Sequence, residues 1–209
     1  QVCCVAVGVV GDISRALGKQ MFEYSDNIFR WLLQNLEDPN IHRSVKPPIL
    51  ACLGDICLAL GGEFERFLQV TVNMLTQVQG KCLPFDVNDL DEDFVEYLNE
   101  LCATVLEAYT SIINGLNDDD KAQLMLPYLP HIVQFLTAVA QNETRSDDVT
   151  SKTVGLIGDI AKNIGPSAKP ALSVPQLGQL VKRELQSDDD TQKSTAQWAL
   201  KHLESLGIS

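Results

Sequence analysis

A short pattern recurs three times along the 209-residue chain and limits the folds that the chain can adopt. It occupies residues 10–18 (VGDISRALG), 53–61 (LGDICLALG) and 157–165 (IGDIAKNIG). In each copy, Gly-Asp-Ile is followed five residues after the isoleucine by a second glycine. A pattern repeated in this detail indicates that one structural unit is used several times, each copy stacked on the next.

The spacing of the copies indicates which kind of unit repeats. The first two copies begin 43 residues apart, and the second and third begin 104 apart, which is two repeats with some extra loop. A period of about 40–47 residues is typical of HEAT and armadillo units, which are built from helices. A degenerate copy is expected at residues 105–109 (VLEAY), and another at 198–200 (WAL), where Trp198 takes the place of the aspartate.

Apolar residues at helical spacing fill the segments between the copies, and turn residues separate these segments. We therefore expect an all-α fold, a right-handed HEAT-repeat α-solenoid of about four and a half helix pairs, or nine helices. The inner helices should cover roughly residues 1–18, 41–60, 91–116, 147–165 and 190–206, and the outer helices 22–36, 63–79, 124–140 and 174–187. Pro47-Pro48 either delays the start of its helix to near Ser44 or bends the helix.

Residues 1–209 are then a single segment, an inner helix at 1–18 followed by repeats at about 22–60, 63–116, 124–165 and 174–206. Because the sequence starts without methionine inside an apolar pattern, we expect a piece of a longer chain. No apolar run approaches the roughly 18 residues of a membrane span. Five of the six cysteines lie in helical apolar patterns, with Cys82 in a loop, which favours free thiols in the cytosol or nucleus.

The net charge of −12 is concentrated in the centre of the chain. Residues 81–151 carry 14 acidic and 3 basic side chains, a net charge of −11, whereas residues 152–209 carry 6 acidic and 7 basic side chains. A surface of this sign argues against nucleic acid and anionic membranes as partners and favours a basic protein ligand. The alternative is that the acidic loops only keep the chain soluble.

Four carboxylates are expected to form a column on the inner helix at 91–116, opposite its apolar stripe, and almost no basic residue accompanies them. They are Asp93, Glu96, Glu100 and Glu107. A solvated face would normally mix both signs of charge, so a basic ligand and a merely solvated face both remain open. The repeated Asp12, Asp55 and Asp159 flank the apolar stripe, where a ladder of hydrogen bonds between repeats is the favoured interpretation. Trp198 at the same position is either a core residue or a half-exposed anchor.

The residues that catalysis requires are not grouped in this sequence. The three histidines are isolated, the Gly-x-x-Gly pairs lie within helices, and the carboxylates form columns instead of converging in an apolar pocket. We therefore predict a binding protein with no enzymatic activity, no catalytic residues, no cofactor and no metal.

Several segments resemble the late repeats of the importin-β (karyopherin-β) family of nuclear import receptors. The resemblance is carried in order by residues 42–47 (HRSVKP), 54–56, 61–64, 93–101 (DFVEYLNEL), 106–110 (LEAYT), 154–159 (VGLIGD) and 196–199 (AQWA). It covers essentially the whole chain and implies the last four to five HEAT repeats of a superhelical receptor. The rival within binding proteins is another HEAT scaffold, such as a phosphatase scaffold subunit.

The resemblance also implies partners. The basic importin-β-binding helix of importin-α would bind the column of Asp93, Glu96, Glu100 and Glu107, with Trp198 packed against the helix's aliphatic stems. Asp12, Asp55 and Asp159 are weaker candidates for the same surface. Phe-Gly nucleoporins would dock between outer helices, and Ran-GTP would act mainly through repeats outside this chain. The implied location is the cytoplasm, the nucleus and the nuclear pore of the nuclear envelope.

Overall fold

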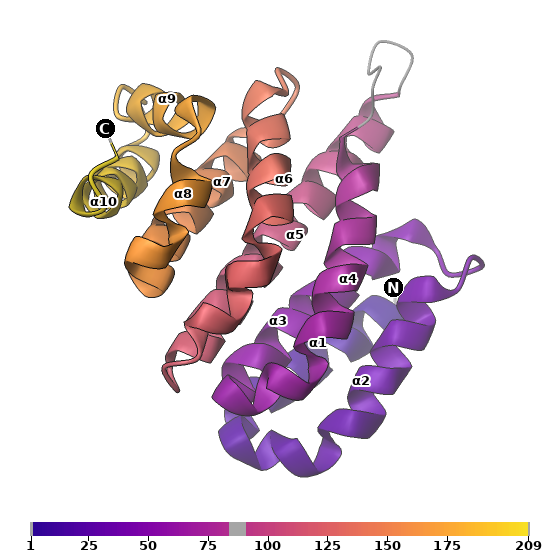
Figure 1. Ribbon diagram of the computed structural model, residues 1–209. Coiled ribbons are helices and arrows are strands. Elements are labelled where there is room, and N and C mark those ends of the chain that lie inside the picture. The colour runs from indigo at the N-terminus through magenta and orange to yellow at the C-terminus, as the bar shows by residue number, and fades with distance from the viewer. Residues whose placement is uncertain (1, 84–90, 209) are drawn as a thin grey trace.

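The computed structural model describes residues 2–83 and 91–208, and this part of the chain is helices and turns without strands (Figure 1). The α-helices are α1 Val2–Leu17, α2 Phe22–Glu37, α3 Lys46–Leu60, α4 Glu65–Cys82, α5 Glu92–Asn117, α6 Leu129–Gln141, α7 Asp147–Asp159, α8 Lys169–Leu172, α9 Pro175–Glu184 and α10 Asp190–Ser205. Short 3₁₀ segments lie at Gly18–Met21, Arg43–Val45, Gly61–Phe64, Ala122–Tyr128 and Gly165–Ala168, and a π-helical turn at Ile160–Ile164 ends the α7 run.

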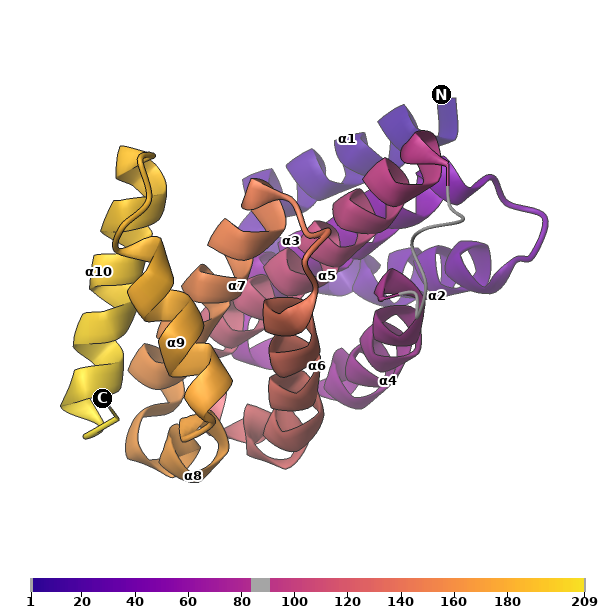
Figure 2. The ribbon, with the colours of Figure 1, turned by 90° about the horizontal axis from the view of Figure 1, so that it is seen from above.

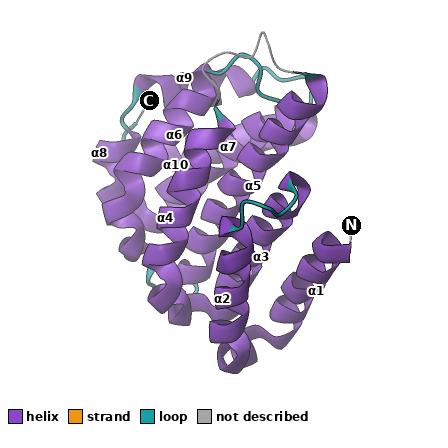
Figure 3. Cartoon of the chain, turned by 90° about the vertical axis from the view of Figure 1, so that its right-hand side faces the viewer, coloured by secondary structure: helices purple, strands orange, loops and turns teal. Residues whose placement is uncertain are grey.

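The helices form two layers, as an α-solenoid requires. The inner helices α1, α3, α5, α7 and α10 each pack against the next in that order, and α2, α4, α6 and α9 lie on their outer side (Figure 2). Leu53 and Leu106 of the inner layer and Leu32, Leu75 and Leu136 of the outer layer are fully buried between them. The predicted fold class is therefore confirmed, with α1 at one end of the stack (Figure 3).

Polar side chains start three of the inner helices. The carboxylate of Asp91 accepts a hydrogen bond of 2.7 Å from the backbone N–H of Phe94 at the start of α5, and Asp189 accepts bonds from Thr191 and Gln192 at the start of α10. Ser146 caps α7 in the same way. Each cap satisfies backbone donors that have no partner inside the helix, which defines where the inner helix begins.

The closing glycine of each repeated pattern has a conformational role. Gly18, Gly61 and Gly165 have φ angles of 54°, 57° and 67°, which residues with a β-carbon rarely adopt. Each is the first residue of the 3₁₀ turn that leads from an inner helix toward the following outer helix. The spacing from Gly-Asp-Ile to the second glycine therefore measures the distance from the middle of an inner helix to its end.

The described residues contain ten α-helical segments, one more than the nine helices predicted. Nine of these ten segments correspond to predicted helices, and the additional one is the four-residue α8. Pro175 explains the division between α8 and α9, because the ring of a proline disfavours the α conformation of the residue before it. Val174 is accordingly extended, with φ −96° and ψ 118°.

Two predicted ranges started early. Helix α3 begins at Lys46, after a 3₁₀ turn, so the alternative of a late start near Ser44 is confirmed, with Pro47 and Pro48 in its first turn. Helix α6 begins at Leu129, after a 3₁₀ segment containing Pro127.

The expectation that no apolar run is long enough to span a membrane was also wrong. The helical stretch Arg43–Cys82 passes that test of length and composition, with a mean hydropathy of 1.4 over its best 18 residues. Of that window, 67% is buried inside the fold, because α3 is packed between the inner helices α1 and α5 and is covered by its neighbours. Cys82, predicted in a loop, is instead the buried last residue of α4.

Candidate functional site

The acidic column lies on the exposed side of α5, as its spacing predicted. Asp93, Glu96, Glu100 and Glu107 are all exposed, whereas Leu98 and Leu101 on the opposite side are buried. Helix α5 contains no lysine or arginine. Among the described residues, no ion pair includes Asp93, Glu96 or Glu100. Three like charges at helical spacing repel one another mildly, and none of them is held in an ion pair by the described part of the chain.

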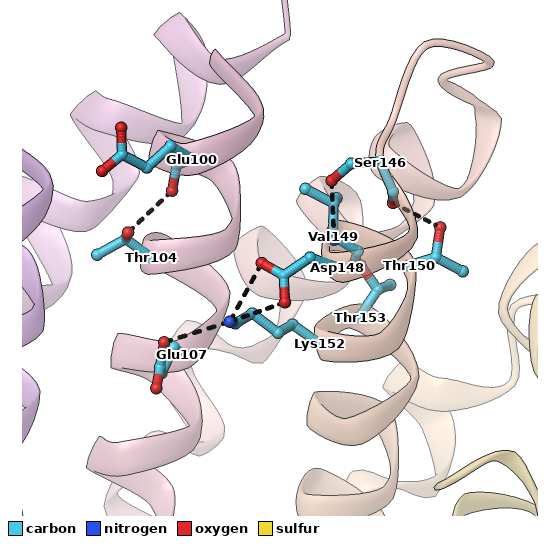
Figure 4. Close-up of polar contacts among 9 residues, drawn as sticks. All are labelled: Glu100, Thr104, Glu107, Ser146, Asp148, Val149, Thr150, Lys152 and Thr153. Atoms are coloured by element: carbon cyan, nitrogen blue, oxygen red, sulfur yellow. Dashed lines mark hydrogen bonds and ion pairs between the residues drawn. The ribbon is translucent and has the colours of Figure 1, made fainter. Parts of the chain in front are cut away.

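The fourth carboxylate of the column has a partner on the neighbouring inner helix. The ammonium of Lys152, on α7, lies 3.5 Å from Glu107 and 3.0 Å from Asp148 (Figure 4). Burial disfavours the charged form of Lys152, but hydrogen bonds and charge attraction from Asp148 and Glu107 outweigh it and raise the pKa of the amine. Lys152 therefore bridges α5 and α7 as a cation at neutral pH.

A groove of about 250 Å³ opens between α5 and α7 beside this bridge. Its walls are Glu107 and Thr110 on α5 and Ser151, Lys152, Gly155 and Asp159 on α7. Asp159 is only 9% exposed. Burial raises the pKa of its carboxyl to about 6, although a hydrogen bond with the Asn114 side chain and the charge of Lys162 oppose the shift. At neutral pH the groove therefore holds a partly desolvated negative charge.

The raised pKa of Asp159 gives the stability of the chain a pH dependence. The folded chain binds the proton of the Asp159 carboxyl more tightly than the unfolded chain does. Protonated Asp159 therefore adds to the free energy of unfolding below about pH 4, and this added stability is lost as the pH rises through 6. We expect Asp159→Asn to raise the free energy of unfolding by roughly 1–3 kcal/mol at pH 7.5 and to leave it unchanged near pH 4. Urea titrations at the two pH values measure this difference. Glu143→Gln, in an exposed loop, is the control, and an equal gain at both values would contradict the explanation.

The repeated aspartates form contacts between successive inner helices. Asp55 on α3 accepts a hydrogen bond from Arg15 on α1, and Asp159 on α7 faces Asn114 on α5, whose side chain opposes the rise in the pKa of the carboxyl. In both cases the aspartate meets a side chain of the preceding repeat. Asp12, in the first copy, is exposed and pairs with Arg15 of its own helix. These contacts favour the structural interpretation of Asp55 and Asp159, while a role in ligand binding stays a prediction.

The same contacts correct the position of the degenerate copy. The glycine of each Gly-Asp-Ile pattern lies against the residue at the aspartate position of the next inner helix. Gly11 lies against Asp55, and Gly54 lies against Ser111. The copy in α5 is therefore residues 110–112 (TSI), not residues 105–109. Matching by apolar residues alone had shifted the alignment by about one turn.

Trp198 occupies the aspartate position in the last inner helix, as predicted. Its ring packs directly over Gly158 of α7, and the ring of His202 stands edge-on to it with centroids 5.1 Å apart. The side chain is half-buried. Trp198 therefore joins α10 to α7, and its contact with a ligand stays a prediction.

Two features of the surface could not be found from the sequence. A groove of about 700 Å³ lies where α2, α3, α4 and α5 meet, and its apolar lining includes Leu36, Met74, Val78, Phe94 and Tyr97. The guanidinium of Arg43 lies 5.3 Å from the centres of both aromatic rings. The second feature is Leu58, which is 39% exposed one turn after Asp55 on α3. Phe94 and Tyr97 at a spacing of three residues were the only sequence signal for the groove.

Stacked helix pairs with an acidic inner surface and an apolar groove at the ends of outer helices define the class of protein: a helical-repeat α-solenoid. The comparisons with known proteins narrow this class. A family model described as importin subunit beta-1-like TPR repeats matches residues 1–185. The chain belongs to the importin subunit beta-1 family.

Individual relatives agree with this assignment. The importin subunit beta-1 of Arabidopsis thaliana is 37% identical over 210 residues, which cover all of this chain and 24% of the relative. Kap95p, the yeast importin-β, is 29% identical. Its structure in work on RanGDP covers 97% of this chain with a TM-score of 0.85, and its complex with Nup1 covers 97% with a TM-score of 0.83. The chain spans about a quarter of the length of each of these proteins.

Proposed function

We propose that this chain is part of a nuclear transport receptor and that its inner surface binds the basic importin-β-binding helix of importin-α. The observation that carries the proposal is the column on α5, where Asp93, Glu96 and Glu100 are exposed and form no ion pair with any described residue. A basic helix would supply the missing counter-charges.

The inner surface also offers apolar contacts for the stems of long basic side chains. Leu58 is 39% exposed on α3, and Trp198 is half-buried on α10, so aliphatic stems have surfaces to cover on both sides of the acidic helix. Asp12, Asp55 and Asp159 are secondary contacts in this proposal. Such binding combines charge attraction, which speeds encounter and weakens with salt, with a smaller apolar term that does not.

The wider role follows from the family. Receptors of this class move cargo between cytoplasm and nucleus through the nuclear pore, and we propose the same locations for the full protein that contains this chain. Yeast Kap95p is described with Ran and with Nup1. Ran would act mainly through parts of the receptor outside this chain, and the chain would bind proteins instead of nucleic acid or membrane. No enzymatic step belongs to this proposal.

A second partner is supported by the groove where α2, α3, α4 and α5 meet. Its volume of about 700 Å³ and its lining of Leu36, Met74, Phe94 and Tyr97 suit the aromatic side chain of a Phe-Gly nucleoporin repeat. Aromatic rings pair edge-on or offset with other rings and gain contact beyond simple burial. The groove opens beside the outer helices, so both partners could be bound at once.

A titration of this chain with a labelled basic helix of importin-α, repeated at several salt concentrations, tests the proposal. We expect a Kd in the micromolar range or below at low salt that rises steeply with salt, because the contacts are between exposed charges. A Phe-Gly peptide in the same assay should bind weakly and with little salt dependence. Absence of binding by the basic helix at low salt would contradict the proposed function.

A further inference from the structure

Lys152 is an exception on a surface that is otherwise negative. Helices α5 and α7 together contain eight carboxylates and this single basic side chain. Its ammonium lies 3.0 and 3.2 Å from the two carboxylate oxygens of Asp148 and 3.5 Å from Glu107 (Figure 4). One internal cation therefore pairs with Glu107, a carboxylate of the proposed binding surface, and with the neighbouring Asp148.

The side chain of Lys152 also forms one wall of the groove between α5 and α7. That groove contains Glu107 at one side and the buried carboxylate of Asp159 deeper in. Gly155, between Lys152 and Asp159 on α7, leaves space, because a β-carbon there would meet only Thr195, at 4.0 Å. A lysine or arginine entering the groove would reach the position that the Lys152 ammonium occupies.

We propose that Lys152 is an internal competitor, a built-in cation that holds the acidic groove between α5 and α7 until a basic side chain of the ligand replaces it. The proposal rests on the proposed function and adds how the surface selects its ligand. A weakly basic peptide that displaces Lys152 breaks the ion pairs of Lys152 with Glu107 and Asp148 and does not form two new ones in their place. A ligand with arginine at this position replaces them, because its planar fork can bind two carboxylate oxygens at once.

The energies involved permit this exchange. Lys152 is 30% exposed, and its partners Glu107 and Asp148 are 60% and 63% exposed. Ion pairs this open to water are weak and screened by salt, so the bridge can be broken by a ligand that offers several charges together. The ion pairs of Lys152 lower the affinity of the groove for every basic ligand. This loss of affinity is largest for ligands with few charges.

The test compares Lys152→Met, Lys152→Arg and Lys182→Met with the unchanged chain. The probe is a labelled alanine-based helical peptide with four arginines spaced four residues apart, titrated at low and at physiological salt. Methionine keeps most of the apolar stem of lysine without its charge. Lys182 is exposed on the outer helix α9, so its replacement gives the same net charge away from the groove.

We expect Lys152→Met to bind the peptide about three- to tenfold more tightly at low salt, because the internal cation and its repulsion of the ligand are removed. Lys152→Arg should bind no more tightly than the unchanged chain, and Lys182→Met should change affinity less than twofold. Adding Glu107→Gln to Lys152→Met should remove most of the gain, since Glu107 is one of the two released carboxylates.

The possible failures are distinguishable. If the unchanged chain binds and Lys152→Met binds equally or more weakly, the competitor role is overturned and the proposed function stands. If only Lys152→Met binds, the competitor role is supported in its strongest form. If neither binds at low salt, both proposals are overturned. Thermal melting of each variant by circular dichroism identifies any loss of affinity that comes from unfolding.

Discussion

Replacing Gly158 by alanine is expected to lower the free energy of unfolding by about 1–3 kcal/mol, although glycine to alanine normally strengthens a helix. A β-carbon at position 158 would overlap three ring carbons of Trp198. The indole is rigid and is also held by the ring of His202, so relief requires moving the whole side chain of Trp198 or separating α10 from α7.

The sign of this effect should reverse when the tryptophan is absent. In a Trp198→Ala background, Gly158→Ala should stabilise the chain by roughly 0.5–1 kcal/mol, because only the helix propensity remains. Gly155→Ala, one turn earlier in α7, has nothing closer than 4.0 Å and should stabilise both backgrounds. Urea unfolding followed by circular dichroism gives all the values. Equal destabilisation by Gly158→Ala with and without Trp198 would show that another contact is responsible.

The double variant Glu96→Lys/Glu100→Lys is expected to weaken binding of the basic importin-α helix about 100-fold at low salt. Each substitution removes one attraction and adds one repulsion at an exposed site, and roughly 2.7 kcal/mol in total corresponds to that factor. Both side chains are exposed and form no ion pair with described residues, so the fold should lose little stability. The like-charge pair Glu96–Glu100 becomes another like-charge pair, which leaves the helix energy nearly unchanged.

A matched control separates this local effect from the change in net charge. Glu23→Lys/Asp188→Lys makes the same change of four charges at exposed positions on α2 and in the segment between α9 and α10. It should weaken binding less than threefold at physiological salt, where charges more than a Debye length of about 8 Å away are screened. Equal losses in the two double variants would mean that the α5 column is only a solvated face.

Local patterns predicted most of the fold because each one reflects a local constraint. The glycine that closes each repeat has a positive φ angle, and Ser146 and Asp189 cap backbone donors of the helices that follow them. Such features depend on neighbouring residues and are visible without a structure. The short α8 was missed because proline marks a boundary without saying whether one helical turn precedes it.

The candidate site was less predictable than the fold, because its contacts join residues distant in the sequence. The exposed side of the acidic column followed from helical spacing alone. Lys152 was missed because its partner Glu107 is 45 residues away, and the copy in α5 was misplaced because Ser111 shares no side-chain type with Asp55. The large groove combines four helices, and the sequence placed only Phe94 and Tyr97 on one face.

The amino-acid sequence by itself determined the repeat, the helical class, the acidic inner helix and the resemblance to a family, because hydrophobic period, turn residues and charge are properties of single segments. The tertiary structure alone decided which carboxylates are paired. Stacking of α7 on α5 brings Lys152 to Glu107 and buries Asp159, and stacking of α10 on α7 places Trp198 over Gly158. These facts depend on the offset between neighbouring helices, which is set by packing of side chains across the interface and not by the order of residues within either helix.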